Sequence, residues 1–416
     1  MFTQLSRDGP HGMAESSAVR IRVLLACVLL GVVTAQPATA EPRKAGPSKV
    51  RFSTFNASLN RSAAGQLVAD LSTPDNAQAR KVAEVIQVDR PDVLLINEFD
   101  YVPDNRAADL FRANYLRRGQ NGGKPIDYPY AFTAPVNTGV PSGMDFNRDG
   151  RADGPDDAYG FGLFPGQYGM LVLSKYPIDL DRVRTFQKFR WQDMPGALLP
   201  DDPATPAKAD WYSPRQLEVF RLSSKSHWDV PVRINRTTVH FLVSHPTPPS
   251  FDGAEDRNGT RNHDEIRLWA DYITGKAGYL YDDKGKRGGL ERGAKFVIAG
   301  DYNSDPVDGD SVPGAIQQLL DSRRLIDLKP GSRGAVEAAR TQGGANLTHG
   351  ADPRHDTGDF NDNAPGNLRV DYVLPSYGLI PLHSEVFWPV AGSPLARLND
   401  TSDHHLVGVT LLALAR

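Results

Sequence analysis

The stretch Lys295–Pro306, with the sequence KFVIAGDYNSDP, constrains the fold of this chain more than any other. Phe296–Ala299 is a short apolar run, half of it β-branched or aromatic, which predicts a buried strand. The glycine that follows is expected to break this strand. Three polar residues then alternate, namely Asp301, Asn303 and Asp305. If the chain stays extended there, the three side chains share one face.

A carboxylate and a carboxamide at the end of a buried strand suit phosphate-ester chemistry. The carboxylate of Asp301 can bind a cation or orient water, and the amide of Asn303 can donate a hydrogen bond to a non-bridging oxygen. A strand followed by a turn rich in Asp and Asn is an equally good interpretation of this stretch alone. The rest of the chain favours the site, because it supplies the other groups that such a site needs.

The composition sets broad limits. The chain has 416 residues, of which 40% are hydrophobic and 23% charged, values that are ordinary for a globular protein of one large domain or two smaller ones. The net charge of −3 gives no overall basic field that would favour nucleic acid or an anionic membrane, although a local basic groove stays open. No obligate protein partner is evident, and we expect a monomer.

The first 40 residues have the pattern of a signal peptide. Arg20 and Arg22 precede the apolar run Val23–Ala35, and Ala38–Ala40 forms a small-x-small cleavage site. The apolar run is too short to span a bilayer comfortably. We therefore expect a secreted protein that is cleaved after its residue 40, has a flexible leader over 41–49 and has no transmembrane anchor.

The single cysteine, Cys27, lies inside this leading segment. A lipidation site is an alternative interpretation of Leu24–Cys27, but the cysteine stands near the start of the apolar run and not after it. A mature chain without cysteine has no disulfides, no thiol nucleophile and no thiolate metal ligands.

Several further strands are predicted to carry polar residues at their ends. These residues are Asn56 after Val50–Phe55, Glu98 after Val93–Ile96, His245 after Thr237–Ser244, and Asp371 within Leu368–Leu374. A helix predicted over Gln78–Val88 separates the first two strands, so their polar ends can lie side by side. For each residue alone, a solvated glutamate or a satisfied loop histidine is the ordinary alternative.

An acid inside an apolar strand needs a partner, because an unpaired buried carboxylate is costly. Ser402–His405 precedes the last predicted strand and offers Asp403 as a metal or water ligand. It also offers His404, an imidazole that a second acid would orient, and Asp371 is the obvious candidate for that acid.

Three stretches of weak periodicity are predicted to be loop insertions, near 119–166, 185–215 and 330–366. Between them, Leu217–Leu222 and Val230–Ile234 alternate weakly and predict an antiparallel pair of strands. Arg257 and Arg261, in a stretch dense in charge, could clamp a substrate phosphate, with a solvated loop as the alternative.

The first insertion contains a candidate calcium loop, Asp145–Asp156. Its oxygen ligands at positions one, three, five, nine and twelve are Asp145, Asn147, Asp149, Asp153 and Asp156. Gly150 occupies position six, as in an EF-hand-type loop. The aspartate at position twelve is shorter than the usual glutamate, and no clear helix precedes the loop. We expect a structural Ca²⁺, with a plain acidic loop as the alternative.

Together these motifs resemble the endonuclease/exonuclease/phosphatase superfamily, which includes pancreatic-type deoxyribonuclease, abasic-site endonucleases, inositol-polyphosphate phosphatases and bacterial sphingomyelinases. The matching motifs are Phe55-Asn56, Asn97-Glu98, His245 with its Thr-Pro tail, Gly300–Asn303, Arg369–Tyr372 and Ser402–His404. They occur in the family's order and span residues 50–412. The resemblance implies one α/β domain over residues 50–416, a four-layer α/β/β/α sandwich of two packed mixed sheets flanked by helices.

The resemblance also implies roles. Glu98 resembles the principal Mg²⁺ ligand, with Asn56 and Asp403 nearby. Asp301 resembles the residue that orients or deprotonates water, and Asn303 the donor to the phosphoryl oxygens. His404, held by Asp371, resembles the imidazole that activates the nucleophile or stabilises charge.

His245 resembles the second histidine of the nuclease and sphingomyelinase branches. It stands where the abasic-site enzymes have a tyrosine, which weakens a repair function. The implied protein is a secreted phosphoester hydrolase, dependent on Mg²⁺ or Mn²⁺, that directs water in line onto a phosphodiester or phosphomonoester. A lipid phosphodiesterase and a non-catalytic binding module are the alternatives, and the intact set of site residues argues against the latter.

Overall fold

The apolar runs of the sequence form the central strands of two β-sheets. The computed structural model describes residues 48–413, so the predicted signal peptide and nearly all of the predicted leader lie outside the described residues. The strands are β1 Ser48–Leu59, β2 Val93–Phe99, β3 Tyr130–Phe132, β4 Met170–Ser174, β5 Arg184–Thr185, β6 His227–Ile234, β7 Thr237–Ser244, β8 Lys295–Asp301, β9 Asp371–Pro375, β10 Ile380–Val386 and β11 Val407–Ala413.

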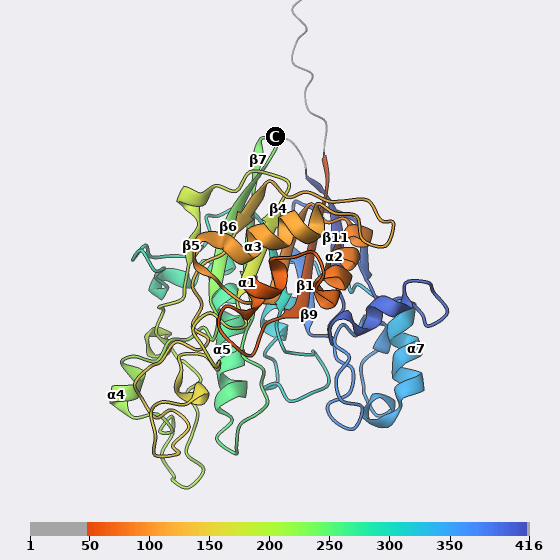
Figure 1. Ribbon diagram of the computed structural model, residues 1–416. Helices are drawn as coiled ribbons and strands as arrows, with labels where there is room; N and C mark the ends of the chain where they lie inside the picture. Colours follow the sequence, from red (N-terminus) through yellow and green to blue (C-terminus); the bar gives the residue numbers. More distant parts are fainter. Residues whose placement is uncertain (1–47, 414–416) are drawn as a thin grey trace, which may run out of the picture. The chain divides into compact units, whose positions relative to one another are not determined.

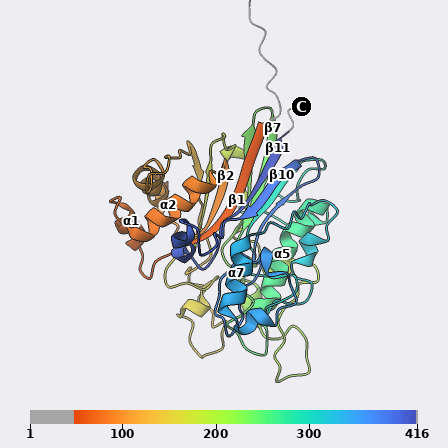
Figure 2. The same cartoon turned by 90° about the vertical axis from the view of Figure 1, so that its right-hand side faces the viewer.

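The α-helices lie outside the two sheets. They are α1 Gln66–Leu71, α2 Ala77–Asp89, α3 Arg106–Phe111, α4 Pro214–Leu217, α5 Arg257–Thr274, α6 Gln317–Leu320 and α7 Arg333–Gln342. One sheet has six strands in the order β10-β11-β1-β2-β4-β3, and the other has five in the order β5-β6-β7-β8-β9. Figure 2 shows α1 and α2 on one side of the strands and α5 on the other. The predicted sandwich of two mixed sheets flanked by helices is therefore confirmed.

Alternate residues of the central strands pack into different cores. In β2, Val93 and Leu95 face the core between the sheets, whereas Leu94 and Ile96 pack against the side chains of α1, α2 and α3. In β8, the odd-numbered apolar residues enter the same inter-sheet core, and the even-numbered ones pack against α5. Because these strands are buried on both faces, they read as continuous apolar runs. Each fully buried side chain of this kind stabilises the fold by about 1.5–3 kcal/mol.

The strand directions bring distant parts of the sequence to one edge. β1 and β2 are parallel, as are β7 and β8, so the carboxyl ends within each pair lie together. β11 runs antiparallel to β1 and β9 antiparallel to β8, so the residues that begin β9 and precede β11 reach the same edge (Figure 1). In open α/β sheets, sites form outside the carboxyl ends of the strands.

Several local predictions were wrong. β1 and β2 continue past their predicted ends, so Asn56 and Glu98 lie inside these strands. β8 does not break at Gly300 but continues to Asp301. A Cβ at Gly300 would lie 2.1 Å from the carbonyl oxygen of Ser244, so the missing side chain permits the close approach of β7 and β8. The strand expected over Leu217–Leu222 is absent, because α4 ends at Leu217 and β6 pairs instead with β7.

The predicted insertions contain some regular structure. β3 lies in the stretch near 119–166, and α7 lies in the stretch near 330–366. Within residues 48–413, no helix has both the length and the apolar content needed to cross a membrane.

Candidate active site

The strand ends bring the predicted catalytic residues together. Asp301 ends β8 and stands opposite Asp371, the first residue of β9. Asn56 lies in β1 beside Asn97 of β2, and Glu98 follows directly in that strand. His245 comes immediately after β7, and His404 lies shortly before β11. Segments more than 300 residues apart in the sequence thus meet in one site.

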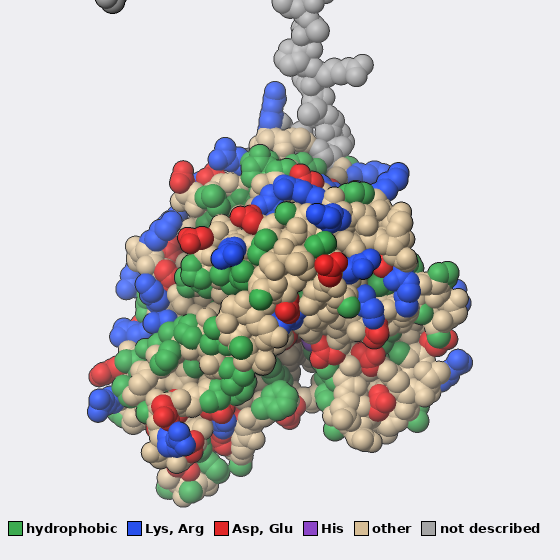
Figure 3. All heavy atoms as spheres, in the orientation of Figure 1, with side chains coloured by type: hydrophobic (Ala, Val, Ile, Leu, Met, Phe, Trp, Pro, Cys, Tyr) green, Lys and Arg blue, Asp and Glu red, His purple; other side chains and the backbone are tan. Residues whose placement is uncertain are grey.

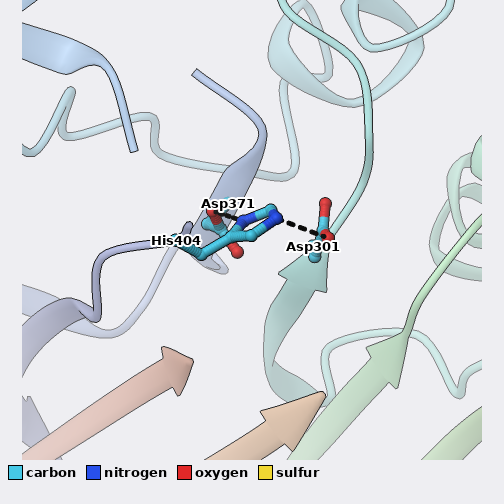
Figure 4. A group of neighbouring side chains, drawn as sticks. All are labelled: Asp301, Asp371 and His404. Carbon is cyan, nitrogen blue, oxygen red and sulfur yellow. Dashed lines mark hydrogen bonds and ion pairs between the residues drawn. The ribbon is translucent and has the colours of Figure 1, made fainter. Parts of the chain in front are cut away.

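His404 lies between two buried carboxylates, as Figure 4 shows. Its Nδ1 is 2.8 Å from Oδ2 of Asp371, and its Nε2 is 3.6 Å from Oδ2 of Asp301. Burial opposes a charge on the ring, but the two carboxylates outweigh burial and hold the pKa of His404 well above its usual value. The predicted pairing of Asp371 with His404 is therefore present in the structure, and the raised pKa favours the imidazolium form of His404.

Asp371 has a second partner that the sequence did not indicate. The hydroxyl of Thr357 donates to Oδ2 of Asp371 at 2.8 Å and accepts from the backbone N–H groups of Val370 and Asp371. This hydroxyl fixes the carboxylate against the start of β9. Asp371 is thereby held in place to orient His404.

Asp301 is the common neighbour of the other groups. Its Oδ2 accepts a hydrogen bond from Nδ2 of Asn56 at 3.0 Å and lies 3.3 Å from Nε2 of His245. Its Oδ1 accepts from the backbone N–H of Asn303 at 2.9 Å. Burial raises the pKa of Asp301 to about 6, against the opposing effect of the positive His404. An acid with this pKa is ionised at neutral pH and still basic enough to take a proton.

Glu98 is half-buried, and among residues 48–413 its carboxylate accepts hydrogen bonds from two side-chain amides. Its side chain accepts from Nδ2 of Asn56 at 3.1 Å and from Nδ2 of Asn60 at 2.7 Å. Burial raises its pKa. Its φ of 58° lies in the left-handed region, which is unfavourable for a non-glycine residue and is typical of functional sites. The sequence did not indicate Asn60 as a site residue, because nothing distinguishes it from other loop asparagines.

Two groups of side chains in the site could bind a cation. Asp403 is exposed, lies close to the same edge and accepts from the hydroxyl of Ser58 at 3.1 Å. Glu98, Asn56 and Asp403 offer hard oxygen donors, and the Glu98 carboxylate lacks a cationic partner, so these residues fit a hard divalent cation. Among residues 48–413, the ligand atoms of Asp301, Asp371 and His404 also come within 4.8 Å of one another. In that second group, the imidazole of His404 already lies between the two carboxylates.

His245 and Asn303 complete the edge of the site. His245 is almost fully buried, and burial, with the positive charges of Lys225 and His404, holds its pKa well below the usual value. Its Nδ1 has no hydrogen-bond partner among the described residues. Asn303 does not continue the extended chain, since its φ is 51°, and its Nδ2 donates to the carbonyl oxygen of Pro246 at 3.1 Å. One hydrogen of that amide stays free for a ligand.

Lys225 is a site residue that the sequence analysis missed. It lies two residues before β6, is 6% exposed and lines the same cavity as Glu98 and Asp301. Burial lowers its pKa, opposed by the carboxylates of Glu265, Glu98 and Asp301. No hydrogen bond or ion pair holds its ammonium group within the described part of the chain. The surrounding sequence, Ser-Ser-Lys-Ser, looks like an ordinary polar loop.

The two predicted arginines have structural contacts of their own. Arg257 forms an ion pair with Glu255. Arg261 is buried and donates to the backbone carbonyls of Leu222, Arg221 and Tyr159. Both line the cavity, but Arg261 uses its guanidinium mainly to hold loops together.

The candidate calcium loop forms turns closed by its own side chains. The Asp145 carboxylate accepts from the backbone N–H groups of Asp149 and Gly150, and Asp149 accepts from Arg151. Asp153 forms an ion pair with Arg151. Asn147 also accepts a backbone hydrogen bond inside the loop, and Asp156 is exposed. The predicted Ca²⁺ site stays a prediction.

Comparison with known proteins places this site in a family. The model of the endonuclease/exonuclease/phosphatase family matches residues 53–404, which include the predicted site residues from Asn56 to His404. The chain belongs to this family. Nucleases and phosphatases both hydrolyse phosphoester bonds, so family membership supports an enzyme of this general class. No curated protein matches the chain significantly.

The chain is also similar to several solved structures. An endonuclease/exonuclease/phosphatase protein of Beutenbergia cavernae is 17% identical over 88% of this chain and 72% of that chain, with a TM-score of 0.47. Sphingomyelinase C of Streptomyces griseocarneus is 17% identical over 87% and 99% of the two chains, with a TM-score of 0.43. Beta toxin of Staphylococcus aureus, solved with bound magnesium ions, is 14% identical over 87% and 99%, with a TM-score of 0.43.

Proposed function

We propose that this protein is a secreted phosphoester hydrolase that depends on a divalent metal ion. The observation that carries the proposal is the placement of the His404 imidazolium between Asp371 and Asp301, beside the amide-bound carboxylate of Glu98. Family membership supports the reaction class. The substrate is a phosphodiester or a phosphomonoester, and water is the nucleophile.

Glu98, Asn56 and Asp403 are the residues that would hold the metal ion. Hard oxygen donors without thiolate favour Mg²⁺ or Mn²⁺. Such an ion supplies Lewis-acid polarisation of the phosphoryl oxygens when bound.

Asp301 and the side chains around it have separate roles in the reaction. The ionised Asp301 orients the attacking water and accepts its proton, since its pKa of about 6 leaves it basic at neutral pH. The free amide hydrogen of Asn303 and the neutral imidazole of His245 can donate to the phosphoryl oxygens. The positive ring of His404 faces the charge that develops as water attacks in line. Asp371 is a positioning residue that keeps His404 charged and oriented.

Secretion is the second part of the proposal. Its support is the sequence of residues 1–40, with Arg20 and Arg22 before the apolar run and a small-x-small site at Ala38–Ala40. Expression of the full chain, followed by mass analysis of the protein in the medium, tests it. An N-terminus at Glu41 is the expected result, and full-length protein retained in the cell would contradict it.

A substrate panel tests the proposed reaction. The purified chain is incubated with plasmid DNA, RNA, an aryl phosphomonoester, the matching diester and sphingomyelin, each with Mg²⁺, Mn²⁺, Ca²⁺ or excess chelator. We expect metal-dependent hydrolysis of at least one substrate, and Glu98→Gln should remove most of it while the protein stays folded. Full activity in excess chelator would contradict the metal dependence. No hydrolysis of any substrate would favour a non-catalytic binding module.

A further inference from the structure

The site opens into a large cavity whose lining points to the kind of substrate. Its volume is about 1320 Å³, and Glu98, Asp301 and His404 form part of its wall. Figure 3 shows the face of Figure 1 hollowed at its lower edge, between the segments that carry α4 and α7, with hydrophobic side chains beside the hollow. A cavity of this size accommodates an organic molecule considerably larger than a phosphate group.

Negative charge outnumbers positive charge in this cavity. Seven carboxylates line it, namely Glu98, Asp156, Asp301, Asp305, Asp308, Asp310 and Asp403. The lysine and arginine side chains of the lining are Lys225, Arg257 and Arg261, and His404 also lines the cavity. Glu255 neutralises Arg257, and backbone carbonyls occupy Arg261. Lys225 is therefore the one cavity-lining lysine or arginine, within residues 48–413, whose charged group has no such contact.

The backbone around Lys225 is held rigidly. The N–H and the hydroxyl of Ser224 donate to Oε1 of Glu265 at 2.6 and 3.1 Å, and the N–H of Thr247 donates to its Oε2 at 2.6 Å. The carbonyl of Lys225 itself accepts from the N–H of Asn137 at 2.9 Å. An unpaired buried cation is costly. Because the ammonium group of Lys225 lines the same cavity as Glu98 and Asp301, we expect a bound anion to pair with it.

Aromatic side chains form another part of the cavity wall. Seven aromatic side chains line it, namely Phe146, Phe161, Tyr168, Tyr212, Phe220, Phe251 and Phe360. Phe251 is 86% exposed and Phe161 is 52% exposed. Large exposed apolar side chains beside a cavity are typical of ligand-binding surfaces.

We infer that the substrate carries a single phosphoryl group, bound by Lys225, and an apolar body that packs on the aromatic wall. A polynucleotide presents many phosphates, and each one bound needs a cation. This cavity has one free lysine and an acidic surround that repels further phosphates. The inference rests on the proposed phosphoester hydrolysis and narrows its substrate class.

Substrate comparison is the first arm of the test. Wild-type protein with Mg²⁺ or Mn²⁺ is assayed on bis(4-nitrophenyl) phosphate, on dihexanoyl phosphatidylcholine as monomers, on a single-stranded DNA oligonucleotide and on plasmid DNA. We expect kcat/KM per phosphoester to be about tenfold or more higher on the apolar esters than on DNA. The first two substrates distinguish an aryl ester from a lipid as the source of the apolar body. Because a single phosphate is bound, log kcat/KM should fall with log salt with a slope of about 1 or less.

Variants of the aromatic wall form the second arm. Phe251→Ser and Phe161→Ser should each raise KM for the preferred apolar ester by about three- to tenfold with kcat nearly unchanged, because the lost contact is equal in ground and transition states. Tyr377→Ser is the matched control, since Tyr377 is 64% exposed and does not line the cavity. It should leave both constants unchanged.

Lys225→Met forms the third arm. It keeps the length and apolar stem of the side chain and removes the charge. We expect kcat/KM to fall about 100-fold or more, while the melting temperature stays the same or rises, because the buried charge is gone. A structural lysine would lower the melting temperature instead. Lys208→Met, at a lysine 84% exposed in its side chain, is the control and should change neither quantity.

The outcomes separate the inference from the proposed function. Wild-type cleavage of DNA as fast as the apolar esters, unchanged KM in both phenylalanine variants, or full activity of Lys225→Met would each overturn the inference and leave phosphoester hydrolysis standing. A lower melting temperature of Lys225→Met would also count against it. Absence of hydrolysis on every substrate would remove the proposed function and the inference together.

Discussion

His404 and His245 reach the site from different sheets, and their pKa values are shifted in opposite directions. His404 precedes β11 of the six-stranded sheet, and the carboxylates of Asp371 and Asp301 outweigh burial to hold its pKa well above the usual value. His245 follows β7 of the five-stranded sheet, and burial together with positive neighbours holds its pKa well below. Both rings lie near the same Asp301 oxygen, at 3.6 and 3.3 Å, so Asp301 does not distinguish them.

The difference comes from a second carboxylate. Asp371 lies 2.8 Å from His404 and is fixed by Thr357. His245 has no such acid, and its Nδ1 is unpartnered among the described residues. One fold thus favours a charged imidazole at His404 and a neutral imidazole at His245, which suits charge stabilisation by the first and hydrogen bonding by the second.

The largest expected effect comes from breaking the charged pair. His404→Ala and Asp371→Asn should each reduce kcat by about 10²- to 10⁴-fold. The double variant should be little worse than His404→Ala, because groups that act as one unit are non-additive. The measurement is kcat for the four members of the cycle. Losses that simply multiply would show that the two residues act independently, and circular dichroism checks that each variant folds.

His245 should tolerate a neutral replacement better than His404 does. His245→Gln keeps an uncharged hydrogen-bond donor and should cost about tenfold in kcat, since a net neutral hydrogen bond contributes about 1 kcal/mol. His404→Gln removes a positive charge and should cost as much as His404→Ala. Kinetics of the two glutamine variants under identical conditions measure the contrast. Equal losses would mean that the charge difference between the rings has no catalytic role.

Activity should fall on the acid side with the pKa of Asp301, which is about 6. Above that pH the carboxylate is ionised and accepts a proton; below it, kcat/KM should drop about tenfold per pH unit. The measurement is the pH profile of kcat/KM at saturating metal. A flat profile between about pH 5 and 8 would show that no group with this pKa is needed.

Asp356 offers a contrast to Asp371, as a buried acid that forms no ion pair among residues 48–413. Burial and the nearby carboxylates of Asp305, Asp308 and Asp352 raise its pKa to about 8. The unfolded chain ionises near pH 4, so the stabilising contribution of this group is complete below that pH and is lost as the pH rises through about 8. Asp356→Asn should therefore raise the melting temperature by about 2 °C or more at pH 8 relative to its effect at pH 5. Equal shifts at both pH values would argue against the raised pKa.

The smallest expected effect concerns the loop Asp145–Asp156, where acids are placed by turns and not by strand ends. If the loop binds Ca²⁺, the ion raises the melting temperature by mass action, and Asp149→Ala abolishes the shift. Thermal melting with Ca²⁺ and with chelator measures it. An unchanged melting temperature of the wild-type protein in saturating Ca²⁺ would count against the site.

The parts of the site that were predictable from sequence share one physical origin. Glu98 and Asp301 lie near the ends of β2 and β8, which are buried on both faces and are therefore visible as continuous apolar runs, and Asn56 lies in the neighbouring β1. The pairing of Asp371 with His404 followed from the cost of an unpaired carboxylate in an apolar strand. The order of motifs then indicated the sandwich.

The site residues and elements that were not predicted from the sequence depend on tertiary contacts. Lys225 and Asn60 lie in ordinary polar loops, and only the folded chain brings them to the cavity. The helix α7, with the sequence RGAVEAARTQ, has a glycine and few large apolar residues, so no apolar stripe marks it. The weak alternation of Leu217–Leu222 predicted a strand, but Leu217 ends α4, and Phe220 and Leu222 belong to the apolar core that also contains side chains of α5.

The most direct test of this account is the protonation state of the two histidines. It is measured by ring-nitrogen NMR on metal-free wild-type protein, with His404→Gln and His245→Gln used to assign the signals. The account predicts that the His404 ring is an imidazolium at neutral pH, whereas the His245 ring is still neutral at mildly acidic pH. Titration of both rings together, near the ordinary histidine pKa of about 6.5, would contradict it.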